Sequence, residues 1–338
     1  MNTTVDVTHN QPNTTKNVRH HSHDSEPRYP EQRSAEPSVL HPTSPVTEHQ
    51  WLEHIENFIG KKKQPAPFVW AGKAVRAVNV ISTRAAGKMA FNIWFTPQNR
   101  PINETDHAWL SSASQETMDY QGNAIPIYQW GSGPTILTVH GWGGHSGQFR
   151  QLTQALVNAG YRVMAFDAPG HGRAEGKTTN AEEISEIIQQ IAQQETLTGI
   201  ISHSIGGLSS HNALNAGAEA GFHVVLNTPM CLSHIVHTFK HQLSLPSEVI
   251  DQHKALMEQK FGDNFWGDYD LRNQSYHMPQ FYSYDDKDHQ VSLEVGKTLK
   301  SQIPTAEHRF TQALGHNKAV RDPEVIDAVK AFIERNAE

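Results

Sequence analysis

Short apolar runs alternate with helix-length segments along most of the chain, from about residue 116 to the end. Residues 135–139, 197–202 and 222–226 are apolar or β-branched at most positions, which is typical of strands buried on both faces. Strands separated by helices form βαβ units, in which the strands run parallel and the helices cover the sheet. The sequence therefore predicts an α/β fold with a mainly parallel sheet between two layers of helices.

The first 50 residues differ in composition from the rest of the chain. They hold six prolines, nine apolar residues and no glycine. Such a segment buries too little apolar surface to offset the entropy lost on ordering, so residues 1–50 are predicted to be a disordered tail rich in histidine and proline. Its histidines could bind a metal weakly, but a solvated tail is the interpretation that we favour.

Residues 51–112 are predicted to form a helical extension packed on the core. Trp51, Ile55 and Ile59 recur at helical spacing, and a second helix is expected from about residue 68 to 94. That second helix is basic and amphipathic, so contact with a membrane surface is one interpretation. Packing of its apolar stripe on a neighbouring core is favoured. Residues 113–338 are expected to form the sheet domain, with a helical insertion at about residues 230–275.

Composition and charge exclude several classes of protein. The 28 lysines and arginines against 35 aspartates and glutamates give a net charge of −7, which argues against nucleic acid as a partner. The single cysteine, Cys231, rules out internal disulfides and a cysteine-rich zinc site. No run of about 18 apolar residues and no signal peptide is visible, so we expect a cytoplasmic protein without a transmembrane segment. The oligomeric state stays open.

The most informative local pattern lies where the strand-like run at residues 197–202 ends. Residues 202–206 (Ser-His-Ser-Ile-Gly) form a tight turn between that run and a helix start. Such a turn would expose the Ser204 hydroxyl above the sheet, beside the N–H groups of the helix N-terminus, as a nucleophile requires. Small residues are needed two positions to either side, and Ser202 and Gly206 meet that need. The alternative is an ordinary helix start with Ser204 as its N-cap.

A second pattern lies at residues 140–144 (His-Gly-Trp-Gly-Gly), which also follow a strand-like run and precede a helix. Glycines there let the backbone pass close to a ligand and turn its N–H groups inward. The N–H groups of Trp142 and Ile205 would then form an oxyanion hole. A plain glycine-rich loop is the alternative. A phosphate cradle is disfavoured because no Gly-Lys-Ser or Gly-Lys-Thr follows.

The order of these motifs resembles that of the α/β-hydrolase family over about residues 115–338. The resemblance rests on the loop at residues 140–144, on Phe-Asp-Ala-Pro-Gly-His-Gly at residues 166–172, and on the turn around Ser204. A further likeness, around residues 76–97 and 130–144, is to a bacterial branch of uncharacterised hydrolases and esterases. The family implies an eight-stranded, mostly parallel sheet, a cap after the sixth strand, and a triad in the chain order nucleophile, acid, histidine.

The order implied by the resemblance selects the other two members of the triad. The family's acid commonly stands three residues before an apolar residue that begins the next helix, which selects Asp288 through Val291. Asp285 and Asp286 lie so close in the sequence that they remain alternatives. His316 lies between the last strand and the last helix, where this family places its base.

These residues predict a serine hydrolase of the carboxylesterase type, with a small ester or acyl compound as substrate and no cofactor or metal. A thioesterase, carbon–carbon hydrolase or perhydrolase would share the triad, and a non-catalytic ligand-binding protein would share the fold. His234, His237 and His241 share one helix face, but no carboxylate completes a metal site there, so a polar face is favoured. The residues expected to shape the site are His140, Gly141, Gly143, His203 and Gly206.

Overall fold

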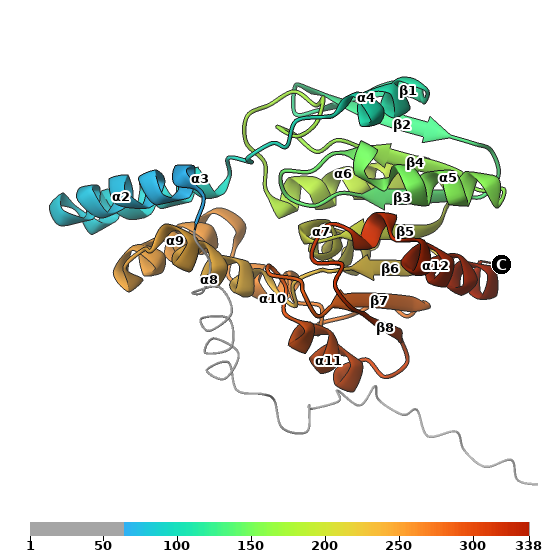
Figure 1. The fold of residues 1–338 in the computed structure, drawn as a ribbon. Coiled ribbons are helices and arrows are strands. Elements are labelled where there is room, and N and C mark those ends of the chain that lie inside the picture. The colour runs from blue at the N-terminus through green and yellow to red at the C-terminus, as the bar shows by residue number, and fades with distance from the viewer. Residues whose placement is uncertain (1–63, 338) are drawn as a thin grey trace, which may run out of the picture. The chain divides into compact units, whose positions relative to one another are not determined.

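The computed structural model describes residues 64–337, so the predicted tail and the predicted helix near Trp51 lie outside the described residues. Within that part, eight strands form one sheet in the order β1-β2-β4-β3-β5-β6-β7-β8 (Figure 1). β1 pairs antiparallel with β2 and β2 with β4, and the other neighbours are parallel. The predicted α/β fold with an eight-stranded, mostly parallel sheet is confirmed. The strands are β1 (Ser114–Tyr120), β2 (Asn123–Trp130), β3 (Thr135–Val139), β4 (Arg162–Phe166), β5 (Leu197–His203), β6 (His223–Leu226), β7 (Gln280–Asp285) and β8 (Glu307–Thr311).

Helices cover both faces of the sheet, which explains why its central strands are apolar throughout. Successive side chains of a strand point to opposite faces, so Ile200 packs against α6 and α7 while Ile201 packs against α5 and α12. Side chains of α11 join the same face as α7. The helices are α5 (Arg150–Asn158), α6 (Ala181–Gln194), α7 (Ile205–Asn215), α11 (Leu293–Gln302) and α12 (Pro323–Asn336), with short 3₁₀ turns η1 (Ser146–Phe149) and η2 (Ala319–Arg321).

A helical insertion separates β6 from β7, where the sequence predicts helices and no strand. It contains α8 (Leu232–Leu243), α9 (Ser247–Phe261) and α10 (Phe265–Asp268). An isolated β-bridge between Cys231 and Asp270 joins the two ends of the insertion. The insertion therefore leaves and returns to the sheet at one place. That it acts as a cap stays a prediction.

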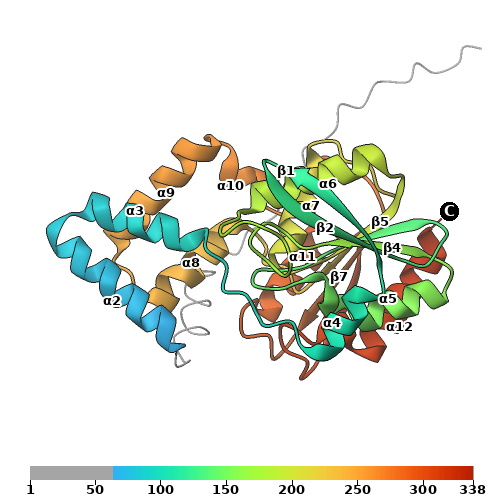
Figure 2. The ribbon, with the colours of Figure 1, turned by 90° about the horizontal axis from the view of Figure 1, so that it is seen from above.

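The chain before the sheet forms a helical hairpin, α2 (Ala66–Ile81) and α3 (Thr83–Trp94), followed by α4 (Glu104–Ser111). The single helix predicted for about residues 68 to 94 is wrong at one point, because the helix breaks at Ser82. The Ser82 backbone is extended, and its hydroxyl accepts the N–H of Ala85 as the N-cap of α3. Figure 2 shows the α2–α3 hairpin beside α8 and α9, and apolar side chains from these four helices form one cluster.

Candidate active site

Ser204 occupies the turn between β5 and α7 in a strained backbone conformation. Its φ of 56° and ψ of −132° lie in a region that residues with a β-carbon rarely adopt. Such strain costs on the order of 1–3 kcal/mol and persists only where the surroundings hold it. Here the N–H of Ser204 donates to the carbonyl of Leu226, and the N–H of Gly207 donates to the carbonyl of Ser204. The turn therefore lifts the Ser204 hydroxyl from the sheet at the first turn of a helix.

Close packing around this turn requires the small residues that the sequence places there. A β-carbon at Gly206 would lie 2.6 Å from the carbonyl oxygen of His140, and one at Gly141 would lie 2.6 Å from the β-carbon of Ser204. Both positions therefore exclude larger side chains. Ser202, where the family pattern has glycine, is fully buried, and its hydroxyl lies 2.9 Å from Nε2 of His223. A serine fits at that position because its hydroxyl has a partner.

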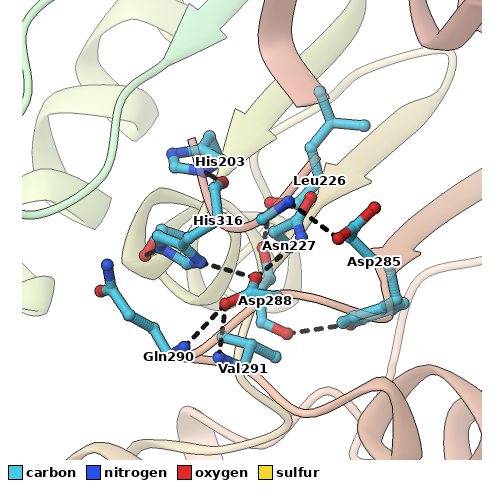
Figure 3. Close-up of polar contacts among 12 residues, drawn as sticks. His203, Leu226, Asn227, Asp285, Asp288, Gln290, Val291 and His316 are labelled. Carbon is cyan, nitrogen blue, oxygen red and sulfur yellow. Dashed lines mark hydrogen bonds and ion pairs between the residues drawn. The ribbon is translucent and has the colours of Figure 1, made fainter. Parts of the chain in front are cut away.

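Three predicted side chains meet above the carboxyl edge of the sheet. Oγ of Ser204 lies 3.0 Å from Nε2 of His316. Nδ1 of the same imidazole lies 2.8 Å from Oδ2 of Asp288 (Figure 3). These residues follow β5, β8 and β7 respectively, so parallel strands that end at one edge bring together positions more than 100 residues apart in the chain.

Asp288 is held as a carboxylate by four hydrogen-bond donors. Oδ1 accepts the N–H groups of Gln290 and Val291 at 2.7 and 2.9 Å, and Oδ2 accepts Nδ2 of Asn227 at 2.8 Å besides facing His316. Burial by itself would raise the pKa of Asp288, but the imidazole and the backbone donors outweigh it and keep that pKa below its usual value. The ionised carboxylate of Asp288 accepts a hydrogen bond from Nδ1–H of His316, so the proton of the neutral ring is on Nδ1 and Nε2 is the acceptor that faces the serine.

Asp285 and Asp286, the two alternative acids, anchor the loop that carries His316. The carboxylate of Asp285 accepts the N–H groups of Leu314 and Gly315 at 3.0 and 2.8 Å. Asp286 accepts the N–H of Ala313 at 2.8 Å. Among the described residues, Asp288 is the aspartate whose carboxylate contacts the His316 imidazole. The neighbouring aspartates position the loop instead.

Asn227 is a site residue that the sequence reasoning missed. It follows β6 directly, with a positive φ of 49°, and lies between the turn of Ser204 and the loop of Asp288. Its side-chain amide donates to Asp288, and its backbone N–H donates to Ser283 of the next strand. In the sequence, its position directly after the strand-like run at residues 222–226 is the one signal that marks it.

His203 contacts the loop that carries His316. Its Nε2 lies 2.8 Å from the carbonyl oxygen of His316, and the two rings are 4.8 Å apart between centroids. Burial, together with the nearby His316 imidazole, lowers the pKa of His203 to about 3, so its ring is neutral and donates Nε2–H to that carbonyl. His203 therefore shapes the site without reaching the Ser204 hydroxyl.

Two buried histidines hold the loop at residues 140–144. Nε2 of His140 accepts the N–H of Ala168 at 3.0 Å, and Nε2 of His171 accepts the N–H of Gly143 at 2.9 Å. Nδ1 of each ring faces a backbone carbonyl oxygen, at 2.8 Å for His140 and 3.1 Å for His171. Burial lowers the pKa of both, that of His171 to about 3, so both rings are neutral and can accept. They fix the backbone conformation on either side of Trp142.

The N–H groups of Trp142 and Ile205 remain available for a ligand. Among residues 64–337, neither donates a hydrogen bond to another group of the protein. Both residues line the cavity that contains Ser204. An available pair of backbone donors in the same cavity as a half-buried hydroxyl is the arrangement that an oxyanion hole requires.

A cavity of about 400 Å³ opens above Ser204 and His316. The α2–α3 hairpin, the helical insertion and the sheet domain all contribute to its walls. Among the described residues that line it there is no aspartate, glutamate, lysine or arginine. Its large apolar lining residues are Phe68, Ile93, Trp94, Trp142, Ile205, Leu232, Ile235, Phe239, Met257, Phe265, Val291 and Val295.

Comparison with known proteins relates the chain to hydrolases. A family model described as serine aminopeptidase, S33, matches residues 133–331. The pimeloyl-acyl-carrier-protein methyl ester esterase of Vibrio atlanticus is 36% identical over 87 residues, which are 25% of this chain and 33% of that protein. The monoglyceride lipase of Rattus norvegicus is 26% identical over 155 residues, which are 41% of this chain and 47% of that protein. The matches thus span less than half of these curated relatives.

Among solved structures, an esterase of Pyrococcus furiosus is similar in fold. The TM-score is 0.54 with 20% sequence identity, and the match covers 72% of this chain and 99% of that one. At this identity the likeness shows the fold alone. The α2–α3 hairpin and α4 precede the residues that the family model matches.

Proposed function

The chain belongs to the serine aminopeptidase S33 family of α/β hydrolases, and from this premise we propose that it cleaves carboxylic esters with Ser204 as its nucleophile. The observation that carries the proposal is the chain of contacts from the Ser204 hydroxyl through His316 to Asp288, at 3.0 and 2.8 Å. The chemistry follows from these positions. Oγ of Ser204 attacks the acyl carbon while Nε2 of His316 takes the hydroxyl proton.

The acyl group is then transferred in two balanced steps. The tetrahedral intermediate collapses, the carbon–oxygen bond to the alcohol breaks, and His316 returns its proton to the leaving alkoxide. Water then attacks the acyl-enzyme ester with His316 again as the base, and a carboxylic acid leaves as Ser204 regains its proton. Asp288 stays ionised throughout and stabilises the imidazolium form of His316 in each step.

The negative charge of the intermediate needs donors that are already in place. We assign this role to the N–H groups of Trp142 and Ile205, because both border the cavity and neither is used within residues 64–337. Removing one donor of this kind typically costs roughly 10²–10³-fold in rate. The backbone N–H groups of Ala168 and Gly143 donate to the rings of His140 and His171. These two hydrogen bonds hold the loop that carries the N–H group of Trp142.

The cavity favours an uncharged acyl compound over a peptide with a free α-ammonium group. An aminopeptidase must bind the α-ammonium of a peptide, and an isolated ammonium in an apolar site is costly without a carboxylate beside it. The described lining holds no carboxylate, and it also lacks a lysine or arginine for an anionic group. The twelve large apolar residues there suit an alkyl or aryl acyl group instead.

A panel of p-nitrophenyl esters of graded acyl length tests the proposal. Ser204→Ala should lower kcat/KM by roughly 10⁶-fold, the scale typical of a lost triad nucleophile. Ser209→Ala is the matched control, since Ser209 lies on the same helix and its buried hydroxyl has no partner within residues 64–337. We expect this control to keep its activity.

Two further arms separate the rival activities that share the triad. Acyl thioesters test for a thioesterase, and aminoacyl p-nitroanilides test for an aminopeptidase. Preference for either over the best oxygen ester would replace the proposed substrate class. Full ester hydrolysis by Ser204→Ala would refute the assignment of Ser204 itself, and a wild-type enzyme that reacts with none of these substrates nor with a fluorophosphonate would favour a ligand-binding protein.

A further inference from the structure

The outer face of the α2–α3 hairpin exposes large apolar side chains. Trp70 is 68% exposed, Val80 87% and Ile81 88%, and Val69 adds to them. These are four of the five large hydrophobic residues that are exposed in the described part of the chain. Residues 70, 73, 77, 80 and 81 lie three or four positions apart along α2, so they share one side of that helix.

The inner face of the same hairpin is already fixed by packing. Val75, Ala86 and Ala90 are fully buried in a cluster with α8 and α9. The guanidinium of Arg76 donates to the carbonyl oxygens of Leu243 and Ser244 at 2.8 and 2.9 Å. The hairpin therefore cannot turn to bury its outer face against the insertion. Helix α2 therefore has apolar residues on its inner and its outer face. That pattern is typical of a helix whose outer face also contacts an apolar environment.

The charges of this segment are all of one sign. From Asn57 to Asn103 the sequence contains eight lysines and arginines and no aspartate or glutamate, although the whole chain has a net charge of −7. Lys73, Arg84 and Lys88 are exposed on the hairpin. Nζ of Lys73 lies 4.7 Å from the centroid of the Trp70 ring. A basic edge around an exposed tryptophan and aliphatic side chains suits the headgroup region of a membrane that carries anionic lipids.

We propose that the outer face of the α2–α3 hairpin docks on an anionic membrane surface. Trp70, Val80 and Ile81 enter the boundary between headgroups and acyl chains, while Lys73, Arg84 and Lys88 contact lipid phosphates. The favoured prediction from sequence, a helix packed on a core with its charges in water, describes the inner face alone. The outer face is what the tertiary structure adds.

Docking by this face would place the cavity beside the lipid. Phe68 from α2 and Ile93 and Trp94 from α3 line the same cavity as Ser204. An apolar ester dissolved in the membrane could then pass from the surface to the nucleophile along the hairpin. This consequence rests on the proposed ester hydrolysis, whereas the docking itself does not.

Co-sedimentation of the full chain with vesicles tests the docking. Wild type should bind vesicles of phosphatidylcholine mixed with phosphatidylserine, and bind vesicles of phosphatidylcholine alone far more weakly. The triple variant Lys73→Gln, Arg84→Gln, Lys88→Gln should bind the mixed vesicles about 10²-fold more weakly, because the loss of each positive charge weakens binding about fivefold. High salt should reduce wild-type binding in the same direction.

The apolar contribution is tested with Trp70→Ser, Val80→Ser and Ile81→Ser combined. We expect this variant to lose most binding to the mixed vesicles. Phe310→Ser is the matched control, because Phe310 is the fifth exposed large hydrophobic residue and lies on β8, outside the hairpin. That control should bind as wild type does. Circular dichroism and cooperative urea unfolding report whether each variant is folded.

Several results would overturn the proposal. The proposal fails if the wild-type protein does not bind the mixed vesicles. It also fails if the variant with Trp70, Val80 and Ile81 replaced by serine binds them as tightly as the wild type does. A dimer in gel filtration that the apolar variant dissociates would assign the face to a second copy of the chain. Ser204→Ala protein keeps the docking test separate from catalysis, because it should sediment with vesicles as the wild type does even though it cannot hydrolyse an ester.

Discussion

His253 is buried in α9 among Phe91, Trp94 and Phe239, with ring centroids 5.2 to 6.1 Å from its own. Neither of its ring nitrogens has a hydrogen-bond partner within residues 64–337. Burial lowers the pKa of His253 to about 4. The site therefore accepts a neutral imidazole and excludes an imidazolium over the range of pH in which a free histidine titrates.

This lowered pKa makes the free energy of unfolding depend on pH. A histidine in the unfolded chain has a pKa of about 6.5, so below that pH the unfolded state binds a proton that the folded state does not. The stabilisation is fully present above about pH 6.5 and is lost as the pH falls toward 4. Between about pH 8 and pH 5, His253 alone should cost about 2 kcal/mol, a large share of the ~5–15 kcal/mol that stabilises a typical protein.

Urea unfolding of wild type and His253→Leu, followed by tryptophan fluorescence, measures this cost. Leucine fills a similar apolar site and cannot bind a proton. The difference in unfolding free energy between the two proteins should change by about 2 kcal/mol in favour of the variant when the pH falls from about 8 to about 5. His107→Gln is the control, since its side chain is exposed, and its difference from wild type should stay constant.

The reasoning fails if wild type and His253→Leu lose equal stability on acidification. That outcome would mean that the folded protein accommodates the proton, through water or through movement of the α2–α3 hairpin away from α9. Either explanation would contradict the burial of His253 on which the magnitude depends.

Three further predictions concern the proposed mechanism. Asp288→Asn should lower kcat by roughly 10⁴-fold. The N–H groups of Gln290 and Val291 would hold the oxygen of the new amide in the place of Oδ1, so its NH₂ group would face Nδ1 of His316. A variant with the kcat of the wild type would contradict this. His171→Phe keeps the ring packing but removes the acceptor of the Gly143 N–H, so kcat should fall by roughly 10²-fold with little change in KM. A rise in KM with kcat unchanged would argue against a role in positioning the loop. Gly206→Ala brings a β-carbon 2.6 Å from a backbone oxygen, so the variant should lose both activity and thermal stability. A variant that keeps the activity and the melting temperature of the wild type would contradict this.

The resemblance to the α/β-hydrolase family explains what could be predicted of the triad. It selected Asp288 through the apolar residue that follows three positions later, and the structure gives a physical reason for that spacing. The N–H of Val291 donates to Oδ1 of Asp288 while its side chain enters the core, so the carboxylate and the helix start are held by one short turn. Relations of this kind depend on a few neighbouring residues, and a sequence displays them directly.

Contacts between distant segments could not be predicted in the same way. His203 donates to the carbonyl of His316 across 113 positions of the chain, and no local pattern indicates that pair. Asn227 was missed because a single asparagine after a strand is common. The break at Ser82 was missed because the apolar stripe continues across it, and the stripe alone does not show that α2 and α3 pack on different helices of the insertion.

Periodicity and turn residues act over a few positions, so the order of strands, helices and chemical groups can be predicted from the amino-acid sequence. Three features depend on how the chain folds back on itself: which of three neighbouring aspartates meets His316, which histidines stay neutral, and which face of the α2–α3 hairpin remains exposed. They depend on it because burial and hydrogen-bond partners come from segments far apart in the chain. Desolvation by those segments, rather than the residue type, sets the charge of an imidazole and determines whether an apolar side chain lies in the core or at the surface.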